Sequence, residues 1–419
     1  MRAKNLLELA TELLRKVLTF EHPADTLVSS FFREHRGLGP RERHALAETA
    51  YDVVRRLPSY RHLAQSGSGP IERRLAIIGW QGAAGVLRAL LAPTEQSWQA
   101  QVAAVDRSSL PEPLRHNLPP WMAQALQAEL GEQFWPLVAA IDRPAPLDLR
   151  VNTFKTKREA AALKLHAHGI EAIPTPYSPL GLRIAGKPAL QTLQVFRDGE
   201  VEVQDEGSQL LALLLDPRRG EMIVDFCAGA GGKTLALGAA MRNTGRLYAF
   251  DVSGHRLAAL KPRLARSGLS NVHPVQIAHE RDERIKRLAG KIDRVLVDAP
   301  CSGLGTLRRN PDLKWRQSPE TVRALQAQQA LILNGAAKLL KSGGRLVYAT
   351  CSLLNAENEG IAREFSAAHK GEFAELPALA ALSAAHVGQA EILVDGNFLR
   401  LWPHRHSTDG FFAAAWTRH

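Results

Sequence analysis

Segments of strand length and segments of helix length alternate along the second half of this 419-residue chain, and this alternation constrains the fold most strongly. Short apolar runs are separated by longer stretches with helical periodicity. The predicted strands are residues 223–226, 246–251, 272–277, 294–298 and 345–349. The pattern predicts an α/β domain with a doubly wound, mostly parallel sheet, whose ligands bind at the carboxyl ends of the strands.

The first predicted strand leads into a glycine-rich loop of sequence CAGAGGKT, residues 227–234. Glycines let the backbone turn tightly and approach a ligand closely, ahead of a helix N-terminus. The Gly232-Lys233-Thr234 tripeptide is similar to the end of a phosphate-binding P-loop, but Cys227 stands where that motif requires its first glycine. A nucleotide hydrolase is therefore a minor alternative, and the loop alone is weak support for any one cofactor.

Asp251 ends the second predicted strand and follows Asp225 by 26 residues. A carboxylate at this place can accept hydrogen bonds from both hydroxyls of a ribose. The alternative is a helix N-cap, because Ser253 and a helical run come next. The glycine-rich loop nearby favours the ribose role, and both a dinucleotide oxidoreductase and an S-adenosylmethionine enzyme fit up to this point.

Two thiols follow the last two predicted strands. Cys301 comes shortly after Asp298, and Cys351 comes just after residues 345–349. A buried structural cysteine is the usual explanation for one such residue, but two at neighbouring strand ends favour chemistry. A thiolate that adds to C6 of a pyrimidine makes C5 nucleophilic toward a methyl sulfonium, and a base then removes the C5 proton. These residues alone leave open which thiol attacks.

Charge and cysteine content narrow the class of protein. The formal net charge is +11 and the pI is near 9.8, which favours a polyanionic partner such as nucleic acid. Three cysteines without zinc-like spacing indicate no disulfide framework, no metal site and a reducing, cytoplasmic location. No apolar run reaches the roughly 20 residues of a membrane span, and residues 75–87 predict one core helix. The charged N-terminus lacks the apolar core of a signal peptide.

Helical periodicity dominates the first 120 residues, where leucines recur at three- and four-residue steps from Leu6. Four arginines lie in or beside an apolar helix stripe that begins near Pro40, and they indicate either a solvated face or an RNA-contacting surface. These arginines are Arg41, Arg43, Arg55 and Arg56. A later basic run with one aromatic residue could grip phosphates and stack a base. It comprises Arg308, Arg309, Lys314, Trp315 and Arg316.

Several motifs in the same order resemble the RsmB/NOP (Nop/Sun) family of RNA cytosine-5 methyltransferases. They are QDEGS (204–208), CAGAGGKT (227–234), DAPCSGLG (298–305), RRNPDLKW (308–315), YATCS (348–352) and DGFF (409–412). The resemblance implies a Rossmann-like class I methyltransferase domain at 204–419. It implies an all-helical, NusB-like RNA-binding domain at 1–140. A small α+β module at 141–203, with a first helix expected to begin near 117, is similar to the middle module of the family.

The resemblance also implies residue roles and an activity. Cys351 would be the nucleophile, Cys301 would aid product release, and Asp298 and Lys233 would lie near the target base. The implied binding residues for S-adenosylmethionine are Cys227, Ala228, Gly229, Ala230, Gly231, Gly232, Lys233, Asp251, Arg256, His279 and Asp298. The expected reaction is methyl transfer to C5 of a cytosine in RNA, with 16S ribosomal RNA as the expected substrate and a monomer as the expected state.

Two departures from the family pattern and three rival functions stay open. Gly229 and Ala230 replace the usual Ala-Pro of the loop, and no Asp follows the third strand, so His279 or Glu280 would meet the adenine. The DNA cytosine-5 enzymes use a Pro-Cys nucleophile, which keeps Cys301 as an alternative attacker. The rival functions are a transfer-RNA cytosine-5 methyltransferase, a nucleotide hydrolase and a non-enzymatic RNA-binding factor.

Overall fold

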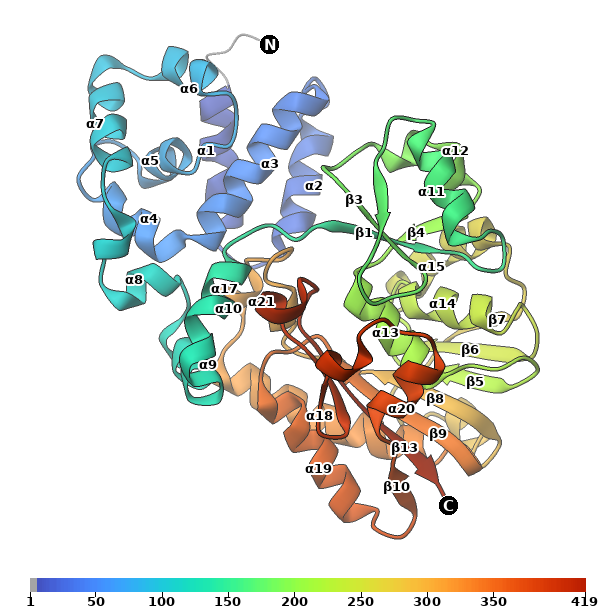
Figure 1. Cartoon of the computed structure of the whole chain (residues 1–419). Helices are drawn as coiled ribbons and strands as arrows, with labels where there is room; N and C mark the ends of the chain where they lie inside the picture. Colours follow the sequence, from blue (N-terminus) through green and yellow to red (C-terminus); the bar gives the residue numbers. More distant parts are fainter. Residues whose placement is uncertain (1–5) are drawn as a thin grey trace. The chain divides into compact units, whose positions relative to one another are not determined.

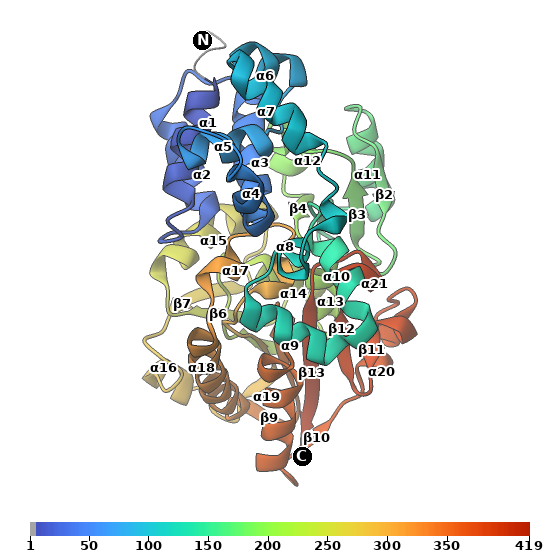
Figure 2. The same cartoon turned by 90° about the vertical axis from the view of Figure 1, so that its left-hand side faces the viewer.

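The computed structural model describes residues 6–419, and in that part of the chain no helix is both long and apolar enough to cross a bilayer. The chain divides into two compact units (Figures 1 and 2). One unit is Met1–Arg143 with Thr306–Pro319, and the other is Pro144–Gly305 with Glu320–His419. Residues 1–5 of the predicted helical domain lie outside the described residues.

The first unit is helical, because apolar residues recur on one face of each helix. In α1, for example, Leu7, Leu13, Leu14 and Val17 are all buried in a shared core. The helices of this unit are α1 (Leu6–Val17), α2 (Ala24–Glu34), α3 (Pro40–Arg55), α4 (Leu57–Ala64), α5 (Ile71–Ile78), α6 (Ala84–Leu90), α7 (Pro93–Ala103), α8 (Glu112–His116), α9 (Pro120–Leu130), α10 (Phe134–Ile141) and α17 (Leu313–Arg316).

The prediction of one helix over residues 75–87 is wrong. Helix α5 ends at Ile78 and α6 begins at Ala84. Gly79 follows α5, and a Cβ atom there would lie 2.5 Å from Cγ2 of Val53, so the chain passes α3 at a distance that only glycine permits. The apolar run therefore supplies two short core helices.

The segment Thr306–Pro319 packs within the helical unit. The indole N–H of Trp315 donates to the Val54 carbonyl at 2.8 Å, and the Lys314 ammonium donates to the Arg55 carbonyl at 2.7 Å. Arg308 and Lys314 are buried. The prediction of a basic run exposed to RNA is therefore wrong for these two side chains, which build the core of this unit.

The arginines of the α3 stripe differ in exposure, and Arg43 and Arg56 are half-buried. Arg55 is buried and donates to the Arg308 carbonyl at 3.0 Å. Arg56 donates to the Asp142 carboxylate at 2.9 Å. Both predicted alternatives, a solvated face and an RNA-contacting face, are therefore wrong for Arg55. Arg41 is exposed and stays a candidate RNA contact.

The second unit contains a small sheet with strand order β2-β3-β1-β4. Its strands are β1 (Leu147–Val151), β2 (Ala172–Pro174), β3 (Gly181–Ile184) and β4 (Val201–Val203). Helices α11 (Arg158–His166) and α12 (Gln194–Arg197) pack against this sheet (Figure 1). Their contact buries a separate core that includes Leu149, Leu165 and Leu182.

A larger sheet follows with strand order β11-β12-β13-β9-β8-β5-β6-β7, and β10 pairs with β13. The run from β9 to β7 is parallel, and β13 adds to β9 in the antiparallel direction. The strands are β5 (Met222–Asp225), β6 (Arg246–Asp251), β7 (Val272–Gln276), β8 (Ile292–Asp298), β9 (Leu340–Thr350), β10 (Phe373–Glu375), β11 (Val394–Asp395), β12 (Phe398–Leu401) and β13 (Phe411–Arg418).

Helices cover both faces of the larger sheet. One apolar core joins the sheet to α13, α14, α15 and α20, and a second core joins its other face to α16, α18 and α19 (Figure 2). This arrangement confirms the predicted doubly wound α/β fold. The helices are α13 (Glu206–Leu215), α14 (Gly232–Ala240), α15 (Gly254–Ser267), α16 (Glu283–Lys286), α18 (Pro319–Ala337), α19 (Glu359–Ala368), α20 (Ala378–Ala384) and α21 (Pro403–His406).

A candidate active site at the strand ends

A cavity of about 780 Å³ opens at the carboxyl ends of the parallel strands, where a doubly wound sheet binds its ligands. It brings together nearly all of the predicted site residues. Those that line it are Cys227, Ala228, Gly229, Ala230, Gly232, Lys233, Asp251, Arg256, His279, Asp298, Cys301 and Cys351. Gly231 does not line the cavity.

Two glycines of the loop have a backbone conformation that other residues rarely adopt. Gly229 has φ +56° and Gly231 has φ +83°. A Cβ atom on Gly231 would lie 2.1 Å from Cδ1 of Leu260, so Gly231 is needed for close packing against α15. Nothing lies within 4 Å of a Cβ built on Gly229, which faces open space. The predicted tight turn is thus present, with Gly231 serving the packing behind the loop.

Asp251 connects the end of β6 to the glycine-rich loop. Its Oδ2 accepts the Gly229 N–H at 2.8 Å, and its Oδ1 accepts the Ser253 N–H at 2.7 Å. The N-cap of α15 is Ser253, whose side chain accepts the Arg256 N–H. The alternative role of Asp251 as the N-cap is therefore filled by another residue, and its carboxylate lies at the cavity wall.

Lys233 and Asp298, which both line the cavity, form an ion pair with Nζ 2.7 Å from Oδ2. Burial lowers the pKa of Lys233, but the Asp298 carboxylate raises it, and the net result is a pKa above the ordinary value. Lys233 is therefore a cation at neutral pH. It is held by a carboxylate and not by the backbone of a phosphate-binding loop.

The neighbouring Thr234 hydroxyl donates to Oδ2 of Asp225 at 2.6 Å, and both residues are buried. In a P-loop the corresponding hydroxyl would coordinate a magnesium ion. Its engagement behind the loop disfavours the nucleotide hydrolase. Burial raises the pKa of Asp225 to about 7, and the nearby carboxylates of Asp298 and Asp251 raise it as well.

The sulfur atoms of Cys301 and Cys351 lie 3.5 Å apart. The two residues follow the adjacent strands β8 and β9, which pair in parallel with Asp298 opposite Ala349. The contact with Cys351 and burial together raise the pKa of the Cys301 thiol well above its ordinary value. Cys301 is therefore a neutral thiol at pH 7, and it lines the same cavity as Cys351.

Two glycine backbones cross beside Cys351. The Gly305 N–H donates to the Cys351 carbonyl at 2.8 Å, and the Gly410 N–H donates to the Gly305 carbonyl at 2.9 Å. A Cβ atom on Gly305 would lie 2.1 Å from the Gly410 carbonyl oxygen. This close approach explains, in physical terms, the second glycine of the DAPCSGLG motif and the glycine of the DGFF motif.

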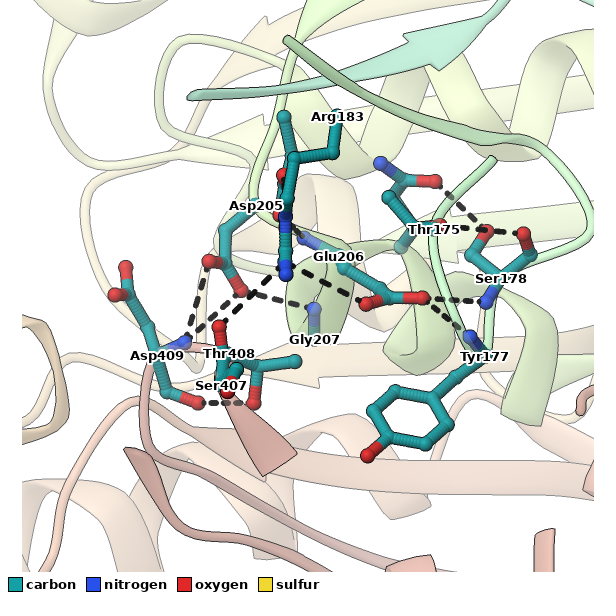
Figure 3. Close-up of polar contacts among 12 residues, drawn as sticks. Thr175, Tyr177, Ser178, Arg183, Asp205, Glu206, Gly207, Ser407, Thr408 and Asp409 are labelled. Carbon is teal, nitrogen blue, oxygen red and sulfur yellow. Dashed lines mark hydrogen bonds and ion pairs between the residues drawn. The ribbon is translucent and has the colours of Figure 1, made fainter. Parts of the chain in front are cut away.

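The QDEGS motif makes polar contacts with β3 and with the DGFF segment (Figure 3). Asp205 accepts the Gly207 N–H at 2.8 Å and so caps α13, and it also accepts the Asp409 N–H at 3.2 Å. Arg183 from β3 lies 3.7 Å from the buried Glu206 carboxylate. The motif thus ties the small sheet and the DGFF segment to the start of α13.

Several residues of the cavity wall had no predicted role in the site, and three of them belong to polar segments beside the glycine-rich loop. These three are Gln204, Ser208 and Arg263. The Arg263 guanidinium donates to the Ala230 carbonyl of the glycine-rich loop at 2.6 Å. Gln204 and Ser208 belong to the QDEGS motif, and this motif could have indicated their place in the site from the sequence. Arg263 lies in an ordinary amphipathic helix, whose pattern indicates no site residue.

Both residues predicted to meet the adenine stand after the third strand, at the cavity wall. His279 and Glu280 both line the cavity. His279 Nδ1 accepts the Arg281 N–H at 3.0 Å, and Glu280 pairs with the Arg281 side chain at 3.4 Å.

Within residues 6–419 no cluster of three His, Cys, Asp or Glu side chains could hold a metal ion.

Known proteins match the chain over most of its length. The family described as "16S rRNA methyltransferase RsmB/F" matches residues 212–417, and "Methyltr_RsmF/B-like, ferredoxin-like domain" matches residues 118–191. A Synechocystis protein named "Probable ribosomal RNA small subunit methyltransferase B" is 31% identical over 97% of this chain and 98% of its own length.

Two solved structures share the fold. The crystal structure of a protein called PH0851 has a TM-score of 0.80 at 25% identity, and covers 100% of this chain and 99% of its own. A Pyrococcus horikoshii protein titled "Methyltransferase Homolog Protein" has a TM-score of 0.62 at 30% identity, and covers 75% of this chain and 100% of its own.

Proposed function

Because this chain belongs to the 16S rRNA methyltransferase RsmB/F family, we propose that it methylates C5 of a cytosine in RNA through a covalent cysteine adduct. At the coarser level the protein is an S-adenosylmethionine-dependent RNA methyltransferase. The observation that carries the finer proposal is the pair of thiols, 3.5 Å apart, in the wall of the cofactor cavity.

The residues of the cavity fit S-adenosylmethionine, which supplies an electrophilic methyl group. The cavity volume of about 780 Å³ lies within the range of small-ligand sites. Asp251 offers carboxylate oxygens for the ribose hydroxyls, and Gly229 leaves open space beside them. Arg256 and either His279 or Glu280 lie along the same wall and would meet the remaining polar groups.

The chemistry we assign begins with the Cys351 thiolate, which forms a bond to C6 of the cytosine. The ring then carries negative charge that the largely buried Lys233 ammonium, held by Asp298, can stabilise. C5 bonds to the methyl carbon as the methyl–sulfonium bond breaks and leaves a neutral thioether, a base takes the C5 proton, and the C6–sulfur bond breaks to release Cys351. Cys301, a neutral thiol beside Cys351, is assigned to this last elimination as the group that gives a proton to the departing Cys351 sulfur, and it is not the base that takes the C5 proton.

The test of this function is the position of the methyl group in RNA. Bisulfite sequencing of total RNA from a strain lacking the gene should reveal a 16S ribosomal RNA cytosine that has lost its 5-methyl group. Loss at a transfer-RNA position instead would identify the alternative substrate. An unchanged 5-methylcytosine map would refute cytosine-5 methylation and return the non-enzymatic RNA-binding factor to consideration.

A further inference from the structure

Glu357 is a fully buried carboxylate beneath the two thiol-bearing loops, and no part of the reaction above uses it. Its Oε1 accepts the Ser302 N–H at 2.9 Å and the Gln329 side-chain N–H at 3.0 Å. Its Oε2 accepts the hydroxyls of Ser302 and Ser352, both at 2.5 Å. Four donors from three segments therefore converge on one carboxylate.

The two serines are the immediate successors of the two cysteines. Their hydroxyl oxygens lie 3.1 Å apart, beside sulfur atoms that lie 3.5 Å apart. Glu357 is itself anchored, because its carbonyl accepts the Tyr348 hydroxyl at 2.6 Å from the interior of β9. The carboxylate thus fixes the loop after β8 and the loop after β9 to the same point.

We propose that Glu357 is the positioning residue that sets the separation of Cys301 and Cys351. The inference rests on the proposed function for its chemical meaning, since attack and elimination need both thiols at one base. Glu357 does not line the cavity, so it acts through the serines and touches no substrate. Buried charge-assisted hydrogen bonds suit this role because they are short and geometrically strict.

Two substitutions separate positioning from simple stability. Glu357→Ala removes the acceptor of all four donors and leaves them unpaired in the interior. Glu357→Gln keeps the shape and the Oε1 contacts, and its amide can donate to the two serine hydroxyls, which are able to accept. Positioning therefore predicts loss in the first variant and rescue in the second. Glu364→Gln, at an exposed residue of α19, is the matched control.

The thiol separation can be measured without RNA or S-adenosylmethionine. Phenylarsine oxide forms two arsenic–sulfur bonds with a thiol pair, while its oxygen leaves as water with the two thiol protons. Intact-mass spectrometry of the full chain, titrated with a competing small dithiol, gives the dithiol concentration that removes half of the arsenical. Cys301→Ala, which lacks the pair, defines the signal of a single thiol.

We expect Glu357→Ala to release half of the arsenical at a dithiol concentration at least tenfold lower than the concentration that the unsubstituted protein requires. Glu357→Gln should stay within threefold of it, and Glu364→Gln should be unchanged. The proposal would be overturned if Glu357→Ala had a native circular dichroism spectrum and released half of the arsenical at a dithiol concentration within twofold of that for the unsubstituted protein. If that variant does not fold, the Ser302→Ala/Ser352→Ala double variant replaces it, and a change of less than threefold there would overturn the proposal equally.

Methylation kinetics supply the second readout. Glu357→Ala should lower kcat at least tenfold with an unchanged KM for S-adenosylmethionine, and Glu357→Gln should recover most of kcat. A rise in KM with unchanged kcat would assign Glu357 to the cofactor cavity and reject the positioning role. The arsenical assay does not depend on methylation activity, so it would still test the positioning role of Glu357 if the covalent mechanism were refuted.

Discussion

The Lys233 ammonium lies 2.7 Å from the Asp298 carboxylate and joins the glycine-rich loop after β5 to the end of β8. The side chains of these residues are only 12% and 29% exposed. An opposite charge at this distance and burial interacts much more strongly than a surface pair. The ion pair thus holds a cation at the place where we expect the target base.

Removing either charge of this ion pair should lower the stability of the folded protein. We expect Lys233→Met and Asp298→Asn each to lower the unfolding free energy by about 2 kcal/mol, because the remaining charge loses its partner in a partly buried site. The double variant should lose less than the sum, with a coupling energy of roughly 1–3 kcal/mol. Urea unfolding of the four proteins measures the coupling, and strict additivity would contradict a direct interaction.

Removing the Asp251 carboxylate should weaken the cofactor complex. Asp251→Ala should reduce the binding free energy of S-adenosylmethionine by roughly 1.5–3 kcal/mol, the scale of a hydrogen bond to a charged group. Isothermal titration calorimetry measures the change. Unchanged affinity would remove Asp251 from the ribose site, and tight magnesium-dependent ATP binding would favour a nucleotide hydrolase.

The buried Asp225 predicts a pH dependence of stability. Burial raises its pKa to about 7 in the folded protein, whereas it is near 3.9 when unfolded. The folded state therefore binds the extra proton between these values, and this contribution to stability is lost as pH rises from about 4 to about 7. Asp225→Asn lacks the titration but keeps an acceptor for Thr234.

Relative to the unsubstituted protein, Asp225→Asn should gain about 2–3 kcal/mol of unfolding free energy between pH 5 and pH 8. Chemical denaturation at several pH values measures this difference. Asp395→Asn, at an exposed position, serves as the control and should show no such trend. A flat difference for Asp225→Asn would show that the buried carboxyl stays ionised.

The periodicity of the sequence could place the parallel strands because buried strands are continuous apolar runs bounded by glycine or polar residues. The strand ending at Asp251 was predicted with both of its bounds. The strand ending in Thr350 begins earlier than predicted, at Leu340. Its first residues were not predicted as strand because Lys341, Gly343 and Gly344 interrupt the apolar run. Local patterns report burial, and residues 341–343 are exposed, with Gly343 at φ +75°.

Contacts between residues far apart in the sequence could not be predicted from local sequence patterns. The segment Thr306–Pro319 belongs to the helical unit, although it stands between two strands of the larger sheet. Arg308 and Lys314 read as a charged surface, yet backbone carbonyls more than 250 residues away accept from Lys314 and Trp315. Glu357 was missed for the same reason, since its four donors come from Ser302, Gln329 and Ser352.

The helical unit should contribute electrostatically to RNA binding. Deleting residues 1–140 is a poor test, because it would strip the partners from Trp315 and Lys314. Arg41→Glu is cleaner, since Arg41 is exposed at the start of α3. We expect weaker RNA binding and a salt dependence reduced by roughly 0.7–0.9 in the log–log slope for the lost phosphate contact. Filter binding at several salt concentrations measures both.

Arg218→Glu, at an exposed arginine of the other unit, is the matched control for Arg41→Glu. The two variants change the net charge equally, so a difference between them reports a local contact and not a general field. Equal losses in the two variants, or no loss in Arg41→Glu, would contradict an RNA-contacting role for the start of α3.

The two thiols should have separable roles in the reaction. If Cys351 attacks C6, Cys351→Ala should lose methyl transfer almost completely, because C5 is then never activated. Cys301→Ala should still attack and transfer the methyl group but stall before elimination, with the RNA attached through Cys351. Denaturing electrophoresis should show a protein–RNA band that carries label from S-adenosylmethionine with Cys301→Ala and with neither Cys351→Ala nor the double variant.

The 3.5 Å distance between the sulfur atoms makes the reverse assignment geometrically possible, and the same experiment decides it. A labelled band with Cys351→Ala and none with Cys301→Ala would make Cys301 the nucleophile, as in the DNA cytosine-5 enzymes. Retained methylation in both single variants, with no band in any of them, would refute covalent catalysis. The thiols would then be packing residues, and only the cofactor cavity would remain of the proposed site.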